Sequence, residues 1–145
     1  MSDEEMDSPK VLEALEEVLR QQGASILTLT LLAGSLRGLG GAAVKPSLRS
    51  FVLAELEDTY LLAEKMSALG GCPRFDVAAV EVPTEPDRAM TQLLEHEREA
   101  IAALHAVIPH SGQEPRSEAL EHLLEHVIMR KQQQIDFLWH ATQSA

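Results

Sequence analysis

The sequence is poor in cysteine and in aromatic residues. Cys72 is the only cysteine among 145 residues, so the chain cannot form an internal disulfide. Aromatic residues make up 3% of the chain, whereas hydrophobic residues make up 45%. A core of this composition is built from Leu, Ile, Val, Ala and Met, which favours helices over a sheet. We therefore expect a single all-α globular domain.

Long hydrophobic runs and an excess of basic residues are also missing. The most apolar stretch, residues 26–36, is too short and too interrupted to cross a bilayer. The net charge is −11, and such a surface repels phosphate backbones and anionic lipids. These features exclude nucleic acid and membranes as expected partners. The single cysteine, together with an acidic N-terminus that has no signal pattern, predicts a cytoplasmic protein.

Sequence motifs for nucleophilic catalysis and nucleotide binding are absent as well. There is no GxSxG, GxGxxG or P-loop, and no base can be assigned to Cys72 in its Gly/Pro turn. His122 and His126 are spaced to clamp a metal on a helix surface. They lie in a charged segment off the hydrophobic stripe, however, and we interpret them as part of a solvated helix face. No catalytic residue is predicted.

Hydrophobic residues recur at helical spacing in four segments. We predict a disordered acidic tail over residues 1–8 and a four-helix bundle over residues 9–145. Gly38, Gly40 and Gly41 are expected to end the first helix, and prolines to open the other three. The predicted helices run from Pro9 to about Leu36–Gly38, from Pro46 to Leu69, from about Thr84 to Pro109, and from Pro115 to about Thr142.

Residues 70–84 show no helical period and are bounded by prolines. A connection of this length suits a chain that crosses the whole bundle before the next helix begins. The second and third helices would then run parallel. The second half of the first helix is apolar on more than one side, so it is covered either by this connection or by a partner chain. We expect a homodimer or higher oligomer through the first two helices.

Each of the four helices has a polar residue where its hydrophobic stripe requires an apolar one. In the third helix this residue is Glu97, which lies between Leu94 and Ile101. A buried carboxylate is costly unless it meets a cation, a metal or several hydrogen-bond donors. The matching depths predict one polar layer inside the bundle, formed by Gln22, Glu55, Glu97 and Lys131, with Asp58 and Gln134 one turn further along their helices.

The order of these elements resembles the ferritin-like superfamily, and bacterioferritin-like proteins most of all. The resemblance extends from about Pro9 to Thr142 and includes the ALGGCP stretch (68–73) and the QIDFLW stretch (134–139). It implies a ferritin-like bundle with a long crossover between the second and third helices. In that family, two helices each give one Glu to a di-iron centre and two others each give a Glu-x-x-His pair.

Few of the ligands that the resemblance implies are present in this chain. On the first helix, Gln22 stands in the place of a Glu. On the second helix Glu55 matches a ligand, but Asp58 replaces the expected His. The residue after Glu55 is Leu56, where bacterioferritins have the methionine that binds haem, so no haem is expected.

The other two helices continue this pattern. Glu97 on the third helix matches a family ligand. On the fourth helix, Lys131 replaces a Glu and Gln134 replaces a His. A cation in a ligand position repels metal, so the resemblance implies a degenerate di-iron site.

Two functional hypotheses follow. In the first, Lys131 supplies the positive charge in place of metal, Glu55 and Glu97 surround it, and Gln22 and Gln134 donate further hydrogen bonds. The protein then binds no cofactor and acts as a non-catalytic structural or protein-interaction subunit. In the alternative, Lys131 points away, and Glu55, Asp58 and Glu97 bind iron or another divalent cation in a divergent iron-oxidising protein.

Overall fold

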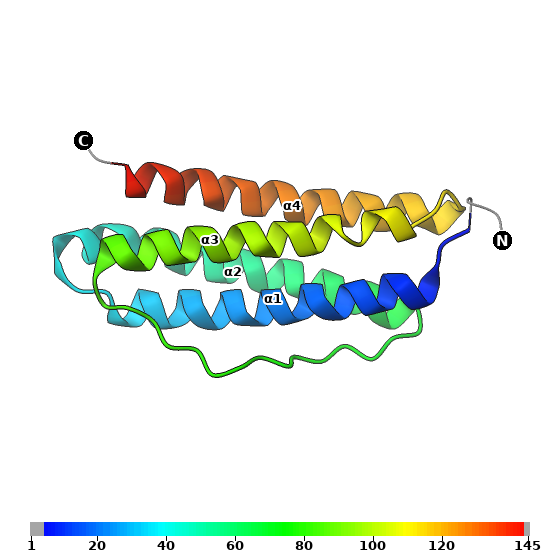
Figure 1. Cartoon of the computed structure of the whole chain (residues 1–145), viewed down its shortest axis with the longest axis horizontal. Coiled ribbons are helices and arrows are strands. Elements are labelled where there is room, and N and C mark those ends of the chain that lie inside the picture. The colour runs from blue at the N-terminus through cyan, green and yellow to red at the C-terminus, as the bar shows by residue number, and fades with distance from the viewer. Residues whose placement is uncertain (1–4, 144–145) are drawn as a thin grey trace.

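The computed structural model describes residues 5–143 and consists of four long helices (Figure 1). Among these residues there is no β-strand, and one 3₁₀ turn, Ile108–His110, follows the third helix. This architecture confirms the predicted all-α four-helix bundle. The helices are α1 (Ser8–Ser35), α2 (Gly38–Ala68), α3 (Pro86–His105) and α4 (Pro115–Thr142).

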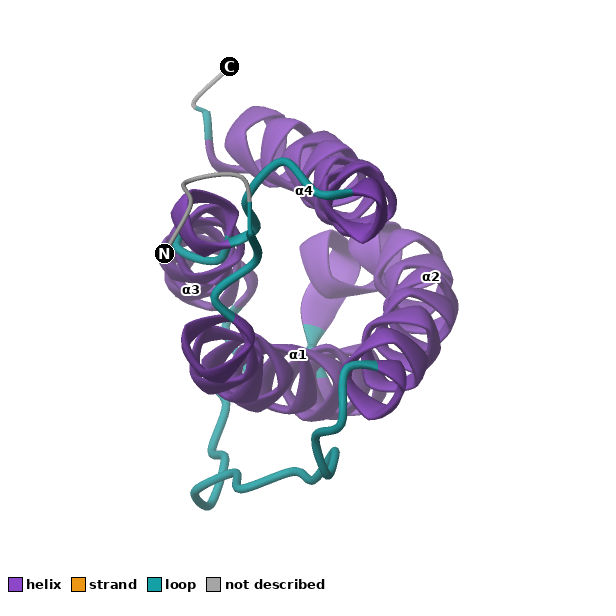
Figure 2. Ribbon diagram, turned by 90° about the vertical axis from the view of Figure 1, so that its right-hand side faces the viewer, coloured by secondary structure: helices purple, strands orange, loops and turns teal. Residues whose placement is uncertain are grey.

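The helices α1 and α2 are antiparallel, as are α3 and α4, whereas α2 and α3 run in the same direction (Figure 1). Residues 69–85 connect α2 to α3 and run along the outside of α1 over much of the bundle's length. The view along the bundle shows α1 between α2 and α3, with α4 on the opposite side (Figure 2). This topology brings residues from all four helices to a common level.

Polar side chains cap two of the helices. The Asp7 side chain accepts a hydrogen bond from the backbone N–H of Lys10 at the start of α1. The Glu85 carboxylate accepts hydrogen bonds from Asp87 and Arg88 at the start of α3. Each of these helices also has a proline in its first turn, where the missing N–H costs nothing.

The start of α2 differs from the prediction. We expected Pro46 to open the second helix, but α2 begins at Gly38 and contains Pro46 in its interior. Gly41 continues the helix because its lack of a side chain allows close packing: a Cβ atom there would lie 2.9 Å from the carbonyl carbon of Leu36. Pro46 denies the carbonyl of Ala42 its helical donor, but both residues lie on the exposed side, where water can replace the donor.

The end of α3 is also earlier than expected. The helix ends at His105, whereas the sequence predicted that it would extend to Pro109. Pro109 has no N–H for the carbonyl of His105, and its ring clashes with that carbonyl in a regular helix. The chain therefore leaves α3 and forms the 3₁₀ turn that contains Pro109.

The prediction of a disordered tail over residues 1–8 differs from the structure at residues 5–8. Residues 1–4 lie outside the described residues. Met6 is buried in the apolar core. Its backbone N–H donates to the Glu114 carboxylate, and the N–H of Asp7 donates to the carbonyl of His110. These contacts hold the chain against the α3–α4 turn until α1 begins at Ser8.

None of the described helices is long and apolar enough to span a membrane.

Two apolar clusters form the core, one toward each end of the bundle. One cluster includes Leu15, Leu19, Leu62, Leu104 and Leu124, and the other includes Leu29, Leu48, Met90, Leu93 and Leu138. The level between these clusters is occupied by polar side chains.

Candidate functional site: a buried ion-pair layer

All six polar residues predicted for the core are buried, and each is at most 2% exposed. Every helix of the bundle contributes at least one of them. A polar side chain in such a position needs a partner, because it has lost its hydrogen bonds to water. The six are Gln22 on α1, Glu55 and Asp58 on α2, Glu97 on α3, and Lys131 and Gln134 on α4.

The Lys131 ammonium forms the centre of the layer. Its Nζ atom lies 2.8 Å from Glu55 Oε1 and 2.9 Å from Glu97 Oε2. One cation therefore joins α2, α3 and α4. Both distances are in the range of charge-assisted hydrogen bonds, the stronger class of protein hydrogen bonds.

The two carboxylates have different surroundings. Glu97 also accepts a hydrogen bond from Ser25 Oγ, 2.5 Å from its Oε1 atom, so both of its oxygens are engaged. Glu55 Oε2 has no hydrogen-bond partner among the described residues. Ser25 was not predicted as part of the layer, although its position one turn after Gln22 on the same face of α1 was an available signal.

The two glutamines do not have the role proposed for them. Gln22 Nε2 donates to Thr59 Oγ1, 3.1 Å away, rather than to a carboxylate. The side chain of Gln134 makes no hydrogen bond to another described side chain or backbone group, and its Oε1 atom is buried without a partner. The hydroxyl of Ser25 takes the place of the expected glutamine donors because it lies next to Glu97.

Asp58 pairs with groups on α4 other than the central ammonium. Its Oδ2 atom lies 3.1 Å from Arg130 Nε, and its Oδ1 atom lies 3.6 Å from His126 Nε2. Arg130 also contacts the His126 ring, at 2.9 Å. His126 was interpreted from the sequence as solvated, but its ring is only 42% exposed and leans on this carboxylate, whereas His122 is 70% exposed. Arg130 was missed because the sequence does not show on which side of α2 Asp58 points.

Burial and charge act in opposite directions on these groups. Burial raises the pKa of Glu55 from 4.5 to about 7, against the lowering effect of the Lys131 charge and with a further rise from Glu97. Burial also raises the pKa of Asp58 despite the nearby Arg130. For Lys131, burial opposes the charged form, but Glu97 and Glu55 outweigh it and raise its pKa above the ordinary 10.5. One protonated amine thus faces two carboxyl groups.

The sequence over residues 12–143 matches the family model described as the ferritin-like domain. The chain belongs to the ferritin-like family. No curated protein matches it by sequence. Its ferritin-like fold is shared with several solved structures.

A ferritin-like diiron-carboxylate protein from Bacillus anthracis str. Ames superposes with a TM-score of 0.87 at 21% identity, covering 94% of this chain and 98% of that one. A dodecameric thioferritin, the bacterioferritin-related protein of Bacteroides fragilis, gives a TM-score of 0.84 at 14% identity, with 94% and 86% covered. A DPS protein from Vibrio cholerae O1 gives 0.84 at 12% identity, with 94% and 91% covered. At these identities the likeness concerns the fold alone.

The residues of this ferritin-like chain do not fit the di-iron centre that the family implies. The ammonium of Lys131 occupies the space between the two glutamates that match family ligands. Asp58 is paired with Arg130 rather than with Lys131. Over residues 5–143, no three His, Cys, Asp or Glu side chains are grouped so that they could hold a metal ion. We therefore derive no metal chemistry from this layer.

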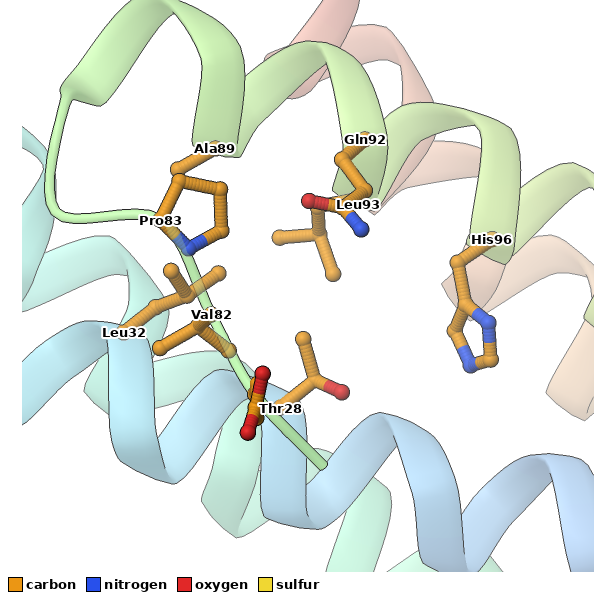
Figure 3. A pocket seen from close by; sticks show the side chains of 9 residues that line it. Thr28, Leu32, Val82, Pro83, Ala89, Gln92, Leu93 and His96 are labelled. Carbon is orange, nitrogen blue, oxygen red and sulfur yellow. The ribbon is translucent and has the colours of Figure 1, made fainter. Parts of the chain in front are cut away.

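A separate small cavity lies between α1, α3 and the connection that precedes α3 (Figure 3). Its volume is about 80 Å³, and Thr28, Glu81, Gln92 and His96 line it together with apolar side chains. The Nε2 atom of His96 is buried there without a partner. None of the residues of the ion-pair layer lines this cavity, so it is distinct from that layer.

Proposed function

We propose that this protein is a ferritin-like subunit without a di-iron centre, in which an internal lysine supplies the positive charge and the bundle acts as a non-catalytic structural or interaction module. The observation that carries the proposal is the position of Lys131 Nζ, within 2.9 Å of both Glu55 and Glu97. This amine gives both carboxylates a positive charge and hydrogen bonds, and no exchangeable metal ion is needed for either.

The energetics of a buried ion favour a structural role for the layer. A buried charge is tolerated only when its partners are close and well oriented. Lys131 is 1% exposed and has two such partners on two other helices. If the helices packed in another register, at least one of these charged groups would be buried without its partner. This cost disfavours other helix registers.

Iron loading tests the proposal. We expect protein incubated with ferrous iron in air, and then freed of excess metal, to contain no stoichiometric iron by elemental analysis. We also expect a metal chelator to leave the melting temperature unchanged, because no metal contributes to the folded state. Two bound irons per chain would overturn the proposal.

The same experiment tests the alternative in which Glu55, Asp58 and Glu97 bind a divalent cation. That alternative requires Lys131 to leave both glutamates and Asp58 to leave Arg130. It predicts one bound cation that is lost in the Asp58→Asn variant. The Lys131→Glu/Gln134→His double variant serves as a positive control, since it restores an anionic ligand and an imidazole on α4 and is expected to gain metal affinity.

The proposal also includes self-association through α1 and α2 and a location in the cytoplasm. Large apolar side chains are exposed on both helices, including Leu27 and Leu31 on α1 and Leu53 and Leu56 on α2. An exposed apolar face of this kind is typical of a protein interface. The single cysteine, an exposed thiol, suits a reducing compartment. Sedimentation velocity on the purified protein tests the self-association.

A further inference from the structure

The small cavity beside α3 has walls from three segments that lie far apart in the sequence (Figure 3). Thr28 and Leu32 come from α1, one helical turn apart, and residues 81–83 come from the connection that precedes α3. The third wall is one face of α3, and it consists of Ala89, Gln92, Leu93 and His96. A molecule bound here would contact two helices and the connection at once.

The two ends of this cavity differ in polarity. Leu32, Val82, Pro83 and Ala89 surround one end, whereas Thr28, Gln92 and His96 lie around the other (Figure 3). Gln92 is exposed, as is Glu81, which also lines the cavity, so solvent can reach the polar groups. An apolar wall with a few polar groups is typical of a small-molecule site.

The polar groups can all act as hydrogen-bond acceptors. The Glu81 carboxylate forms no ion pair with any residue that the structure describes. The Nε2 atom of His96 is buried and has no partner in the same part of the chain. This nitrogen is an acceptor when a neutral imidazole carries its proton on Nδ1, and the hydroxyl of Thr28 is also able to accept.

A primary ammonium group complements these acceptors. It has three N–H donors and no acceptor, and its positive charge is attracted to Glu81, which repels a carboxylate. A cavity of about 150 Å³ can hold a benzene ring. One of about 80 Å³ therefore admits a ligand of roughly three or four non-hydrogen atoms.

We propose that this cavity binds a short primary alkylammonium ion. The ammonium group lies among Glu81, Thr28 and His96, and the alkyl chain packs against Leu32 and Ala89, which are both 1% exposed. The site is separate from the ion-pair layer, so the proposal goes beyond the proposed structural function and does not depend on it.

The wall formed by the connection is held in place without a ligand. The backbone N–H of Arg37, directly after the α1 C-cap, donates to the carbonyl of Thr84 at 3.2 Å. This bond fixes the end of the connection beside the residues that line the cavity. A preformed wall lowers the entropic cost of binding.

A titration followed by ¹H–¹⁵N NMR tests the proposal, with propylammonium chloride as the probe in an amine-free buffer of constant ionic strength. We expect saturable shifts of the amide signals around Thr28, Val82 and His96, with a dissociation constant on the order of 1 mM for so small a ligand. Propionate and 1-propanol have a similar size but lack the ammonium group, and neither should give saturable shifts in this range.

Two variants test the polar end of the cavity. Glu81→Gln removes the charge and Thr28→Val removes the hydroxyl while keeping the shape of the side chain. Each is expected to weaken binding of propylammonium on the order of fivefold. Asp76→Asn makes a matched change of charge at an exposed position of the same connection that does not line the cavity, and it should leave binding unaltered.

Three outcomes would overturn the proposal. The first is the absence of saturable shifts with propylammonium in the folded wild-type protein, and the second is equal binding of propionate. Glu81 and His96 are also residue types that bind zinc, so zinc chloride alone is titrated in parallel. The third outcome is a response of the same residues to zinc and not to propylammonium. None of these outcomes bears on the ion-pair layer, which the iron-loading experiment tests separately.

Discussion

The Lys131 ammonium has lost its hydration shell and has only its two carboxylate neighbours in exchange. It is 1% exposed and lies 2.8 and 2.9 Å from the oxygens of Glu55 and Glu97. Such a group is stable only while its counter-charges stay in place, because an unpaired ion in the core costs several kcal/mol. The stability of the layer therefore depends on all three charged groups together.

Replacing Lys131 with methionine leaves two carboxylates without their cation. We expect the free energy of unfolding at neutral pH to fall by about 3–5 kcal/mol, as measured by urea denaturation. The Lys131→Met/Glu55→Gln/Glu97→Gln triple variant should recover much of this loss, because no buried charge remains. A Lys131→Met variant as stable as the wild type would mean that the amine does not stabilise the layer.

The stability of the protein should also depend on pH through Glu55. Its pKa is about 7 in the folded state and 4.5 in the unfolded state, so the folded state binds more protons between these values. Stability then decreases as pH rises through this interval, on the order of 1 kcal/mol for each pH unit. The raised pKa of Lys131 affects stability only at higher pH, above its ordinary 10.5.

Thermal unfolding of the Glu55→Gln variant isolates this effect. The amide cannot titrate, so the variant should lose most of the decrease in stability between pH 5 and 7. Glu57→Gln, an exposed neighbour on α2, should keep the wild-type profile. An unchanged slope in Glu55→Gln would assign the pH dependence to other groups.

At the scale of the elements, short turns set how the helices meet. The α3–α4 turn contains Gly112, whose φ of +71° is a conformation that residues with a side chain rarely adopt. The N-terminal segment packs directly against it: a Cβ atom at Gly112 would lie 2.6 Å from the carbonyl group of Glu5. This turn therefore holds both the start of α4 and the chain that leads into α1.

Gly112→Ala should destabilise the protein by about 2 kcal/mol, through the left-handed backbone conformation and the clash with Glu5. Gly38→Ala is the matched control. Its φ is +78°, but an added Cβ there meets no heavy atom within 4 Å, so about 1 kcal/mol is expected. Equal losses in the two variants, measured by urea denaturation, would mean that the Glu5 contact does not restrict this turn.

The whole molecule combines a polar interior layer with an apolar outer strip. In most globular proteins charges lie outside and large apolar side chains lie inside. Here α2 directs Glu55 to the inside and Leu53, Leu56 and Tyr60 to the outside. The inner layer finds its partners within one chain, whereas the outer strip lies on the face through which self-association is proposed.

A charge at the centre of the outer strip should therefore prevent assembly without unfolding the bundle. We expect Leu56→Asp to shift the sedimentation coefficient toward that of a monomer, because a charge would enter the exposed apolar face through which self-association is proposed. Met129→Asp, at a side chain on α4 that is 55% exposed, should leave the assembly unchanged. If only the α4 variant dissociated the assembly, the interface would be assigned to α4 instead.

The sequence by itself determined the number of helices and the positions at which polar residues enter the core. These properties depend on the spacing of apolar residues along one helix, which is local information. The burial of Gln22, Glu55, Glu97 and Lys131 follows from that spacing. Helix ends were less predictable, since the start of α2 depends on how closely Gly41 approaches Leu36.

Only the tertiary structure decided which polar groups meet. Ser25 rather than a glutamine donates to Glu97, and Asp58 turns to Arg130 rather than to Lys131. Such choices depend on helix rotation and on distances between side chains far apart in the sequence, which a single-helix pattern does not contain. The sequence therefore determined which residues enter the layer, and the packing of the four helices determined their partners.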